Sequence, residues 1–505
     1  MSQFQTISPQ GIAPDRPIEL LGPDVWARAE NMFFRTNYSQ RTPGAVAMPD
    51  QPPFAPGKLI WVNIAGVDWW LSASSAGVFA WDGSTYSTIT PTVWTAGNPE
   101  DYTWTLLNQV PVLNQDGVDA WSWDGNPANV MTPLPEFASY IQGAKSVRAY
   151  KNFLVAIAPT GNPNVVAWSD AAAPGDVPLV WTPAPDNLAG DVELSEDATS
   201  LIDACVLRND LIVYKREGVY LLQFVGGQFV MASRSLFKNV GILTKGCAVT
   251  VDGFQYVLGD GNIYRHDGNR VEQIGEGIVR DALFSVLSTA YWFRSFVAYN
   301  PRSRSVLFSF PDTGSTGFCT SGLTYNVDQQ SFGSFSPPLE FEHMWPGRYT
   351  SPLAGVNTTW DADADQWNGD VTSWGFTGDA ALIDDLLISS ADEKFYAAVG
   401  VGTWADLPFE STCTTGAFTL GDHLTRKHVK RLWPVMDISE GDCVTFEIGT
   451  SDGPRDTIQW HPPVRCFNTT GKLDYLAQGR YIAVRMRATD VSAPYSMTSL
   501  TIEYE

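Results

Sequence analysis

Short runs of alternating apolar and polar residues fill the chain and predict β-strands along most of its length. Typical runs are Lys58–Asn63, Leu211–Tyr214 and Val306–Phe310. They are rich in the β-branched and aromatic residues that suit a pleated, half-buried surface. The best helical period is the short segment Ile278–Leu287. The pattern therefore predicts an all-β fold with little helix.

Asp-Gly pairs separate many of these runs. This dipeptide readily adopts the positive φ that tight hairpin turns require. The pairs are Asp82-Gly83, Asp116-Gly117, Asp124-Gly125, Asp252-Gly253, Asp260-Gly261, Asp267-Gly268 and Asp452-Gly453. Such frequent turns indicate short strands joined as hairpins.

The turns recur at a regular spacing. Gly77 and Gly261 each open a phrase that ends in Asp-Gly, and looser copies open at Gly117 and Gly218. Gly77 lies 40 residues before Gly117, and Gly218 lies 43 residues before Gly261. A period of this length, built from four short strands, is typical of a β-propeller blade.

We therefore place a β-propeller of six or seven blades over residues 51–403. The loop Ala171–Pro178 interrupts the third blade and the last blade is irregular, which leaves both counts open. The predicted blades cover residues 58–90, 101–133, 145–185, 199–235, 244–276, 291–335 and 342–400. Stacked β-sandwiches with coincidental turn spacing are the alternative architecture.

Two regions lie outside the repeats. Residues 1–50 look irregular and predict an N-terminal arm that packs on the propeller rim or on a neighbour. Residues 404–505 contain the alternating runs Val444–Ile448, Tyr481–Met486 and Ser499–Tyr504. These runs predict a C-terminal β-sandwich-like domain.

Charge and composition narrow the function classes. The chain has 505 residues, with 32 Lys and Arg against 55 Asp and Glu, for a formal charge of −23. Such a balance excludes a non-specific nucleic-acid binder, which neutralises phosphates with excess basic residues. We find no signal peptide and no apolar run near the ~20 residues of a membrane span. The six Cys form no C-x-x-C pair, so we expect free thiols in a protein made in a reducing cytosol.

The motifs that could carry catalysis fit hairpins better. Gly449–Gly453 matches G-x-S-x-G, but Pro454 follows at once where a nucleophile elbow needs a helix. Asp312–Thr316 is a partial sialidase-type Asp-box with no second copy, and the His residues have no H-x-x-x-H spacing. We therefore expect no enzyme, name no catalytic residue, and assign no cofactor and no metal ligand.

Three charged clusters leave alternatives open. Asp361–Asp365 resembles the start of a calcium loop, and an irregular calcium site with Asn368 and Asp370 competes with a solvated acidic hairpin. The basic run Arg426–Arg431 is a candidate contact for an acidic partner or a neighbouring subunit, or simply the solvated face of a strand. A weaker cluster with the same two interpretations comprises Arg294, Arg302 and Arg304.

Several phrases resemble the tail hub proteins of short-tailed bacteriophages, also called nozzle or packaged-DNA stabilisation proteins. The segment Tyr38–Gly44 contains an "arginine, x, proline-glycine" phrase like the one that precedes their first blade. Further similar phrases are Trp168-Ser169-Asp170, Leu211–Tyr214, Gly218-Val219-Tyr220, Gly241-Ile242, Gly261–Tyr264 and the closing strand Leu500–Tyr504.

This resemblance implies a structural virion protein of a phage tail. It implies a homohexameric ring that contacts the head-to-tail adaptor and tail fibre, spike or needle proteins. Such a ring retains packaged double-stranded DNA and conducts it during ejection without specific binding. The protein would be assembled in the host cytoplasm and located in the virion tail.

Two other functions compete with this one. The 19 Trp suggest a carbohydrate-binding receptor component, since an exposed Trp can stack on a sugar. Trp69 and Trp70 are neighbours on a predicted strand and face opposite ways, so at most one of them should be exposed to a sugar. A propeller glycoside hydrolase would need two converging carboxyl groups.

The negative charge of the chain suits a DNA conduit, because acidic walls repel DNA and keep it mobile.

Overall fold

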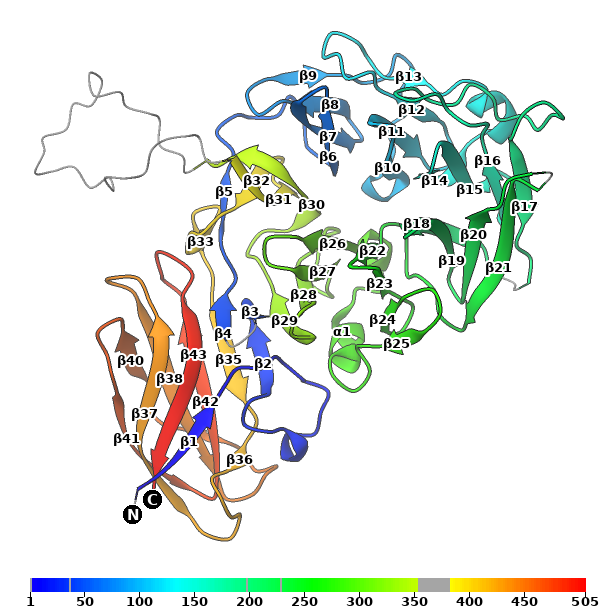
Figure 1. Cartoon of the computed structure of the whole chain (residues 1–505). Coiled ribbons are helices and arrows are strands. Elements are labelled where there is room, and N and C mark those ends of the chain that lie inside the picture. The colour runs from blue at the N-terminus through cyan, green and yellow to red at the C-terminus, as the bar shows by residue number, and fades with distance from the viewer. Residues whose placement is uncertain (1, 36–37, 197–198, 228, 353–381) are drawn as a thin grey trace, which may run out of the picture.

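Six blades of the propeller each consist of four consecutive antiparallel strands, arranged around one axis (Figure 1). The computed structural model describes residues 2–35, 38–196, 199–227, 229–352 and 382–505. The first blade consists of β6 (Lys58–Ile64), β7 (Val67–Ser74), β8 (Gly77–Trp81) and β9 (Tyr86–Thr88). The second consists of β10 (Tyr102–Leu107), β11 (Val110–Gln115), β12 (Ala120–Ser122) and β13 (Thr132–Pro133). The third consists of β14 (Ala144–Tyr150), β15 (Phe153–Pro159), β16 (Val165–Trp168) and β17 (Gly190–Glu193). The fourth blade consists of β18 (Leu201–Leu207), β19 (Asp210–Lys215), β20 (Gly218–Phe224) and β21 (Met231–Lys238). The fifth consists of β22 (Ala248–Val251), β23 (Phe254–Leu258), β24 (Ile263–His266) and β25 (Val271–Gln273). The sixth consists of β26 (Phe296–Asn300), β27 (Ser305–Phe310), β28 (Ser321–Asn326) and β29 (Ser331–Phe335).

The turns between these strands explain their short length. Gly83 has a φ of +94° between β8 and β9, and Gly261 has a φ of +94° between β23 and β24. Asp82 accepts hydrogen bonds from the backbone N–H groups of Ser84 and Thr85, which fixes its turn locally. The predicted Asp-Gly hairpins are therefore confirmed at these positions.

A seventh blade closes the ring with a strand from the start of the chain. Its strands are β30 (Phe341–Thr350), β31 (Leu382–Ser390), β32 (Phe395–Ala398) and β5 (Ala45–Ala47). The β5 strand pairs antiparallel with β32, and β30 contacts β6 of the first blade. The N-terminal segment and the last repeat thus hold the circle closed. The segment Asp361–Asp365, for which the sequence left a calcium site and a solvated acidic hairpin open, lies outside the described residues.

The N-terminal residues form strands rather than the expected irregular arm. These are β1 (Gln3–Ile7), β2 (Trp26–Glu30), β3 (Met32–Arg35) and β4 (Tyr38–Arg41), with the short helix η1 (Ile18–Leu20) between β1 and β2. Each strand has at most five residues and pairs with partners hundreds of residues away, such as Met32 with Ser334. A local pattern does not reveal pairing at such a distance.

The C-terminal residues form two packed sheets, as predicted. One sheet contains β37 (Lys427–Asp437), β41 (Leu473–Gly479) and β43 (Ser496–Tyr504), and takes in β1 and β4. The other joins β2 to β35 (Ser411–Thr415), β36 (Phe418–Thr419), β38 (Cys443–Ser451), β39 (Gln459–Trp460), β40 (Val464–Phe467) and β42 (Tyr481–Ala488). Residues such as Leu432 and Leu473 from the first sheet share a core with Phe446 and Val484 from the second.

Few other elements occur among the described residues. The short strands β33 (Thr403–Trp404) and β34 (Leu407–Pro408) extend the sheet of the seventh blade beside β5. The remaining helices are η2 (Pro99–Asp101), η3 (Phe137–Ile141), α1 (Arg280–Val286) and η4 (Trp292–Arg294). Helix α1 lies within the predicted helical segment. In the same described ranges, no helix is both long enough and apolar enough to cross a membrane.

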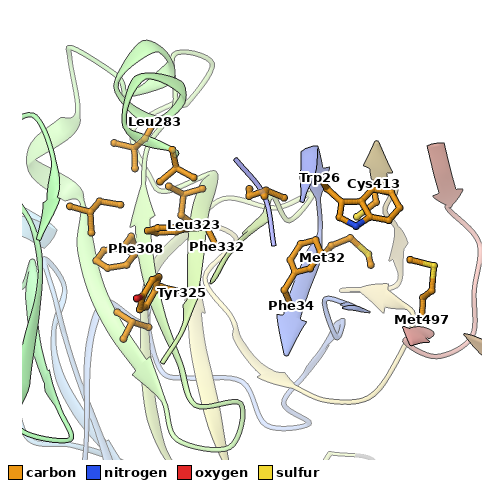
Figure 2. Close-up of a cluster of buried hydrophobic side chains, with 14 of the residues drawn as sticks. Trp26, Met32, Phe34, Leu283, Phe308, Leu323, Tyr325, Phe332, Cys413 and Met497 are labelled. Atoms are coloured by element: carbon orange, nitrogen blue, oxygen red, sulfur yellow. The ribbon is translucent and has the colours of Figure 1, made fainter. Parts of the chain in front are cut away.

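The propeller and the sandwich share one continuous core. Figure 2 shows Trp26, Met32 and Phe34 between the propeller residue Phe332 and the sandwich residue Met497. Trp26 and Met32 are fully buried. The sheet also continues across the boundary, because β3 pairs with β29 of the sixth blade and with β4, which pairs with β43.

Arg41 fixes this junction from within. Its side chain is fully buried and donates hydrogen bonds to the carbonyl oxygens of Gly402 and Phe409, each at 2.8 Å. The guanidinium also lies 3.9 Å from the centre of the Phe409 ring. Gly44, three residues later, passes so close to Thr403 that a Cβ there would lie 1.9 Å from the Thr403 carbonyl oxygen. The "arginine, x, proline-glycine" phrase therefore has a physical role at the boundary between the two units.

Candidate functional site

The first strands of all seven blades line a cavity of about 360 Å³ on the propeller axis. This placement follows from the fold, because the innermost strand of each blade contacts the innermost strands of its neighbours. Seven lining residues are charged at neutral pH in their ordinary states: Lys58, Glu100, Arg148, Asp203, Lys245, Arg294 and Glu342. Much of the remaining wall is apolar or aromatic, including Tyr102, Trp104 and Trp345.

Arg148 and Asp203 form a bidentate ion pair across neighbouring blades. Arg148 Nε donates to Asp203 Oδ1 at 2.7 Å, and Nη2 donates to Oδ2 at 2.6 Å. The Gly246 N–H donates to the same carboxylate at 2.9 Å. Burial opposes ionisation of Asp203, but Arg148 and the backbone donors outweigh it, so the pKa of Asp203 lies below its usual value. The pair is therefore ionised and fixed in geometry.

Two further cations have acidic partners. Arg294 Nε lies 3.1 Å from Glu100 Oε2, and Arg294 Nη1 donates to the Gly317 carbonyl at 2.6 Å. Lys245 Nζ lies 2.7 Å from Asp116 Oδ2, in the turn that follows β11. These contacts join blades that are distant in sequence and leave both cations neutralised.

Lys58 and Glu342 differ from the other charged residues because neither side chain has an ion-pair or hydrogen-bond partner among the described residues. The Lys58 ammonium lies 5.5 Å from the centre of the Phe296 ring. Glu342 Oε1 is buried against Gly57, where a Cβ would approach it to 2.9 Å. Burial lowers the pKa of Lys58 to about 8 and raises the pKa of Glu342 to about 8.

The nucleophile and base candidates near the axis are held in unreactive states. His343 Nδ1 accepts a hydrogen bond from the Leu59 N–H at 3.2 Å, which places the ring proton on Nε2. Burial, followed by the Lys58 charge, lowers the pKa of His343 well below its usual value. The Cys247 thiol donates to the Ser295 carbonyl at 3.2 Å, and burial raises its pKa to about 12. The arrangement suits binding better than nucleophilic chemistry.

The basic run singled out in the sequence lies elsewhere, on β37 of the sandwich, and its cations have partners in the chain itself. Arg426 pairs with Asp452, Lys430 with Glu505, and Arg431 with Asp474 at 2.9 Å. Lys427 lies 3.5 Å from Asp422. The run is therefore offset locally and presents little uncompensated charge to a partner.

The arginines of the weaker cluster connect different parts of the propeller. Arg304 pairs with Asp252 of the fifth blade at 2.7 Å and with Asp328 at 2.8 Å. Arg302 lies 3.2 Å from Asp385 on the seventh blade. These contacts fit a role in holding blades together.

The other motifs occupy hairpins, as expected. Ser451 ends β38 and its hydroxyl donates to the Gly453 carbonyl at 2.9 Å, with no helix after it. Asp312–Thr316 lies in the loop between β27 and β28. Within the described ranges, no group of three or more His, Cys, Asp or Glu could hold a metal ion. All six Cys carry free thiols.

Sequence reasoning singled out Arg294 but missed the other charged residues of the axial cavity. They lie one or a few to a blade, so no local motif unites Lys58, Arg148, Asp203 and Glu342. One signal was available in the sequence. A charged residue in the first, buried strand of a predicted blade is unusual, because buried positions favour apolar side chains.

Comparisons with known proteins identify no family. The sequence matches no family model and no curated protein. Similar solved structures include the Pan2 WD40 domain of Neurospora crassa, at 8% identity and a TM-score of 0.37, covering 72% of this chain and 96% of that one. Others are a lignostilbene dioxygenase of Pseudomonas brassicacearum (9%, TM-score 0.35, 74% and 88% covered) and the AfRom2 CNH domain (9%, TM-score 0.35, 62% and 95% covered). With TM-scores below 0.5, these similarities support no argument about function.

Proposed function

We propose that the chain is a structural protein of a phage tail, which assembles as a ring, most simply a homohexamer, that retains packaged DNA and conducts it during ejection. Its partners would be the head-to-tail adaptor and the tail fibre, spike or needle proteins. Its role would be structural rather than catalytic, in the virion tail after assembly in the host cytoplasm.

The observation that carries the proposal is the way the N-terminal residues tie the units together. The β5 strand closes the propeller, β3 joins the sixth blade to the sandwich sheet, and β1 ends in that same sheet. Relative movement of propeller and sandwich would break strand pairing and expose a shared core. A subunit that contains pressurised DNA must transmit load without changing shape, and this construction suits that task.

The axis of a single propeller cannot be the DNA channel. Its cavity of about 360 Å³ is at the low end of small-molecule sites. The major groove of duplex DNA alone is about 12 Å wide. A conduit must therefore lie between copies of the chain, which is why the proposal requires a ring.

The charge supports passage rather than retention by contact. The formal charge is −23, and the densest basic run is neutralised by acids of the same chain. Surfaces of this kind repel phosphates at low salt. Packaged DNA would then be held back by closure of the ring and its partners instead of by basic residues.

The sequence argument for a carbohydrate-binding component is weakened. Trp69 and Trp70 are both buried, with exposed fractions of 6% and 1%. Among the described Trp residues, Trp433 on β37 is the most exposed, at 37%. A single exposed Trp is a small basis for a sugar site.

The proposal is tested by particle content and by solution mass. Purified particles from cells that encode the chain should contain it in several copies, and the purified protein should have the mass of a multimer. Arg41→Met should reduce incorporation because it loosens the junction, whereas Arg270→Met, at a highly exposed arginine, should not. A strictly monomeric protein that is missing from particles would contradict the proposal.

A further inference from the structure

The axial cavity contains more cations than acids in a protein that is otherwise strongly acidic. Four lining residues are Lys or Arg, and three are Asp or Glu. Arg148 and Arg294 are committed to carboxylates on the same wall, and Lys245 is committed to Asp116. Lys58 is the lining cation that has no carboxylate within ion-pair distance among the described residues.

An ammonium in such a place lacks compensation. Its three N–H donors have no hydrogen-bond acceptor in the part of the chain that the structure describes, and a buried cation is costly unless it is paired and hydrogen-bonded. Glu342 lines the same cavity, and its buried Oε1 has no hydrogen-bond partner among the described residues. An incoming group that accepts hydrogen bonds from both side chains would satisfy the two residues at once.

The rest of the wall defines the body of the ligand. Tyr102, Trp104, Phe293 and Trp345 contribute aromatic surface to the cavity. The volume of about 360 Å³ suits a small molecule, not a peptide or an oligosaccharide. An apolar body with one anionic head matches both parts of the site.

We propose that the axial cavity binds a small organic carboxylate, with its carboxylate group on Lys58 and its apolar body against the aromatic wall. Glu342 in its protonated form donates a second hydrogen bond to the same carboxylate. This binding does not depend on a role in a phage tail, and its failure would leave the ring proposal untouched.

The protonation states of Lys58 and Glu342 predict how carboxylate binding changes with pH. Below pH 8 Lys58 is protonated and Glu342 is largely neutral, which favours an anion. Above pH 8 both groups lose a proton, and both losses oppose binding. The other titratable groups that line the cavity are Glu100, Tyr102, Arg148, Asp203, Cys205, Tyr214, Lys245, Arg294, Tyr299, Cys319 and His343. The pKa of Arg148 is raised and that of Asp203 is lowered, so this pair keeps its charge across pH 6–9. Burial moves the pKa values of the Cys, Tyr and His groups away from that range, so these groups stay neutral.

Calorimetry on the full-length chain tests the proposal with benzoate, phenylacetate and butyrate as probes. At pH 7, at least one of these carboxylates should bind, and benzamide, which has the shape of benzoate without its charge, should bind at least about tenfold more weakly. Affinity for the carboxylate should fall between pH 8 and pH 9.5. Neutral sugars and inorganic phosphate serve as further arms, and preferential binding of either would overturn the carboxylate assignment.

Variants locate the binding. Lys58→Met should abolish carboxylate binding, and Lys472→Met, at an exposed lysine of the sandwich, should leave it unchanged. Glu342→Gln keeps a donor in place of the protonated acid, so it should retain binding at pH 7 and lose less of it at pH 9.5. Failure of all three carboxylates to bind the wild-type chain would overturn the proposal, as would equal binding of benzoate and benzamide or full binding by Lys58→Met. The wild-type measurements decide the matter even if a variant does not fold.

Discussion

The propeller axis and the junction with the sandwich solve the problem of burial in opposite ways. At the junction, Trp26 and Met32 pack in an apolar core, and the buried cation Arg41 donates hydrogen bonds to backbone carbonyl groups. At the axis, charged side chains surround a cavity, and Lys58 and Glu342 have no ion-pair or hydrogen-bond partner among the described residues. The junction is therefore a packed interface with its buried charge satisfied, whereas the axis presents polar groups that a ligand can bind.

The largest effect is expected from emptying the junction. Trp26→Ala removes a fully buried indole from the shared core and should lower the free energy of unfolding by about 3–5 kcal/mol. Trp433→Ala, at the exposed Trp of β37, should cost less than about 1 kcal/mol. Urea unfolding of both variants checks this, and equal losses would mean that the junction is not a packed core.

A smaller loss is expected from breaking the buried ion pair at the axis. Asp203→Asn leaves Arg148 without its carboxylate and should destabilise the chain by about 3 kcal/mol. The matched control is Asp260→Asn, which breaks the exposed pair with Arg216 and should cost less than about 1 kcal/mol. Thermal unfolding separates the two cases; a control that costs as much as Asp203→Asn would remove the distinction between axis and surface.

The unpaired acid at the axis predicts a pH dependence. The pKa of Glu342 is raised from 4.5 to about 8, so the folded state keeps a proton that the unfolded state releases between these values. Its contribution to stability is complete below pH 4.5 and is lost as the pH rises through 8, at up to ~1.4 kcal/mol per pH unit. Lys58, whose pKa is lowered to about 8, acts in the opposite direction above pH 8.

Comparison of the wild type with Glu342→Gln isolates this contribution. The wild type should lose stability relative to the variant as the pH rises from 5 to 8, measured by urea unfolding at each pH. Parallel profiles would show that Glu342 is solvated and ionised in the folded chain.

The smallest effect is expected at the basic run of the sandwich. Arg426→Ala removes one exposed ion pair with Asp452 and should change the free energy of unfolding by less than about 0.5 kcal/mol. A loss of unfolding free energy as large as that of Asp203→Asn would contradict this prediction, because it would mean that the exposed Arg426–Asp452 pair stabilises the fold.

The blades were predictable because their chemistry is local. The first predicted blade, 58–90, corresponds to β6–β9 over residues 58–88, and the sixth, 291–335, to β26–β29 over residues 296–335. Asp-Gly turns and alternating runs specify hairpins without reference to distant residues. The third blade was placed too short because β17 follows a long loop that hides it from its own repeat.

The N-terminal strands and the axial site were not predictable in this way. The β3 strand finds its partner about 300 residues later, and β5 completes a blade whose other strands begin at Phe341. Lys58 and Glu342 converge only because the ring closes between the first and last blades. Circular closure brings together residues that no local pattern relates.

The most direct test of the tail proposal is an electron-microscopy image of the purified full-length chain and of the particles that contain it. The account predicts rings in which several propeller-sandwich subunits surround an open central channel, with the same ring on the tail axis of the particles. Single propellers that never associate, together with particles that lack the chain, would contradict it.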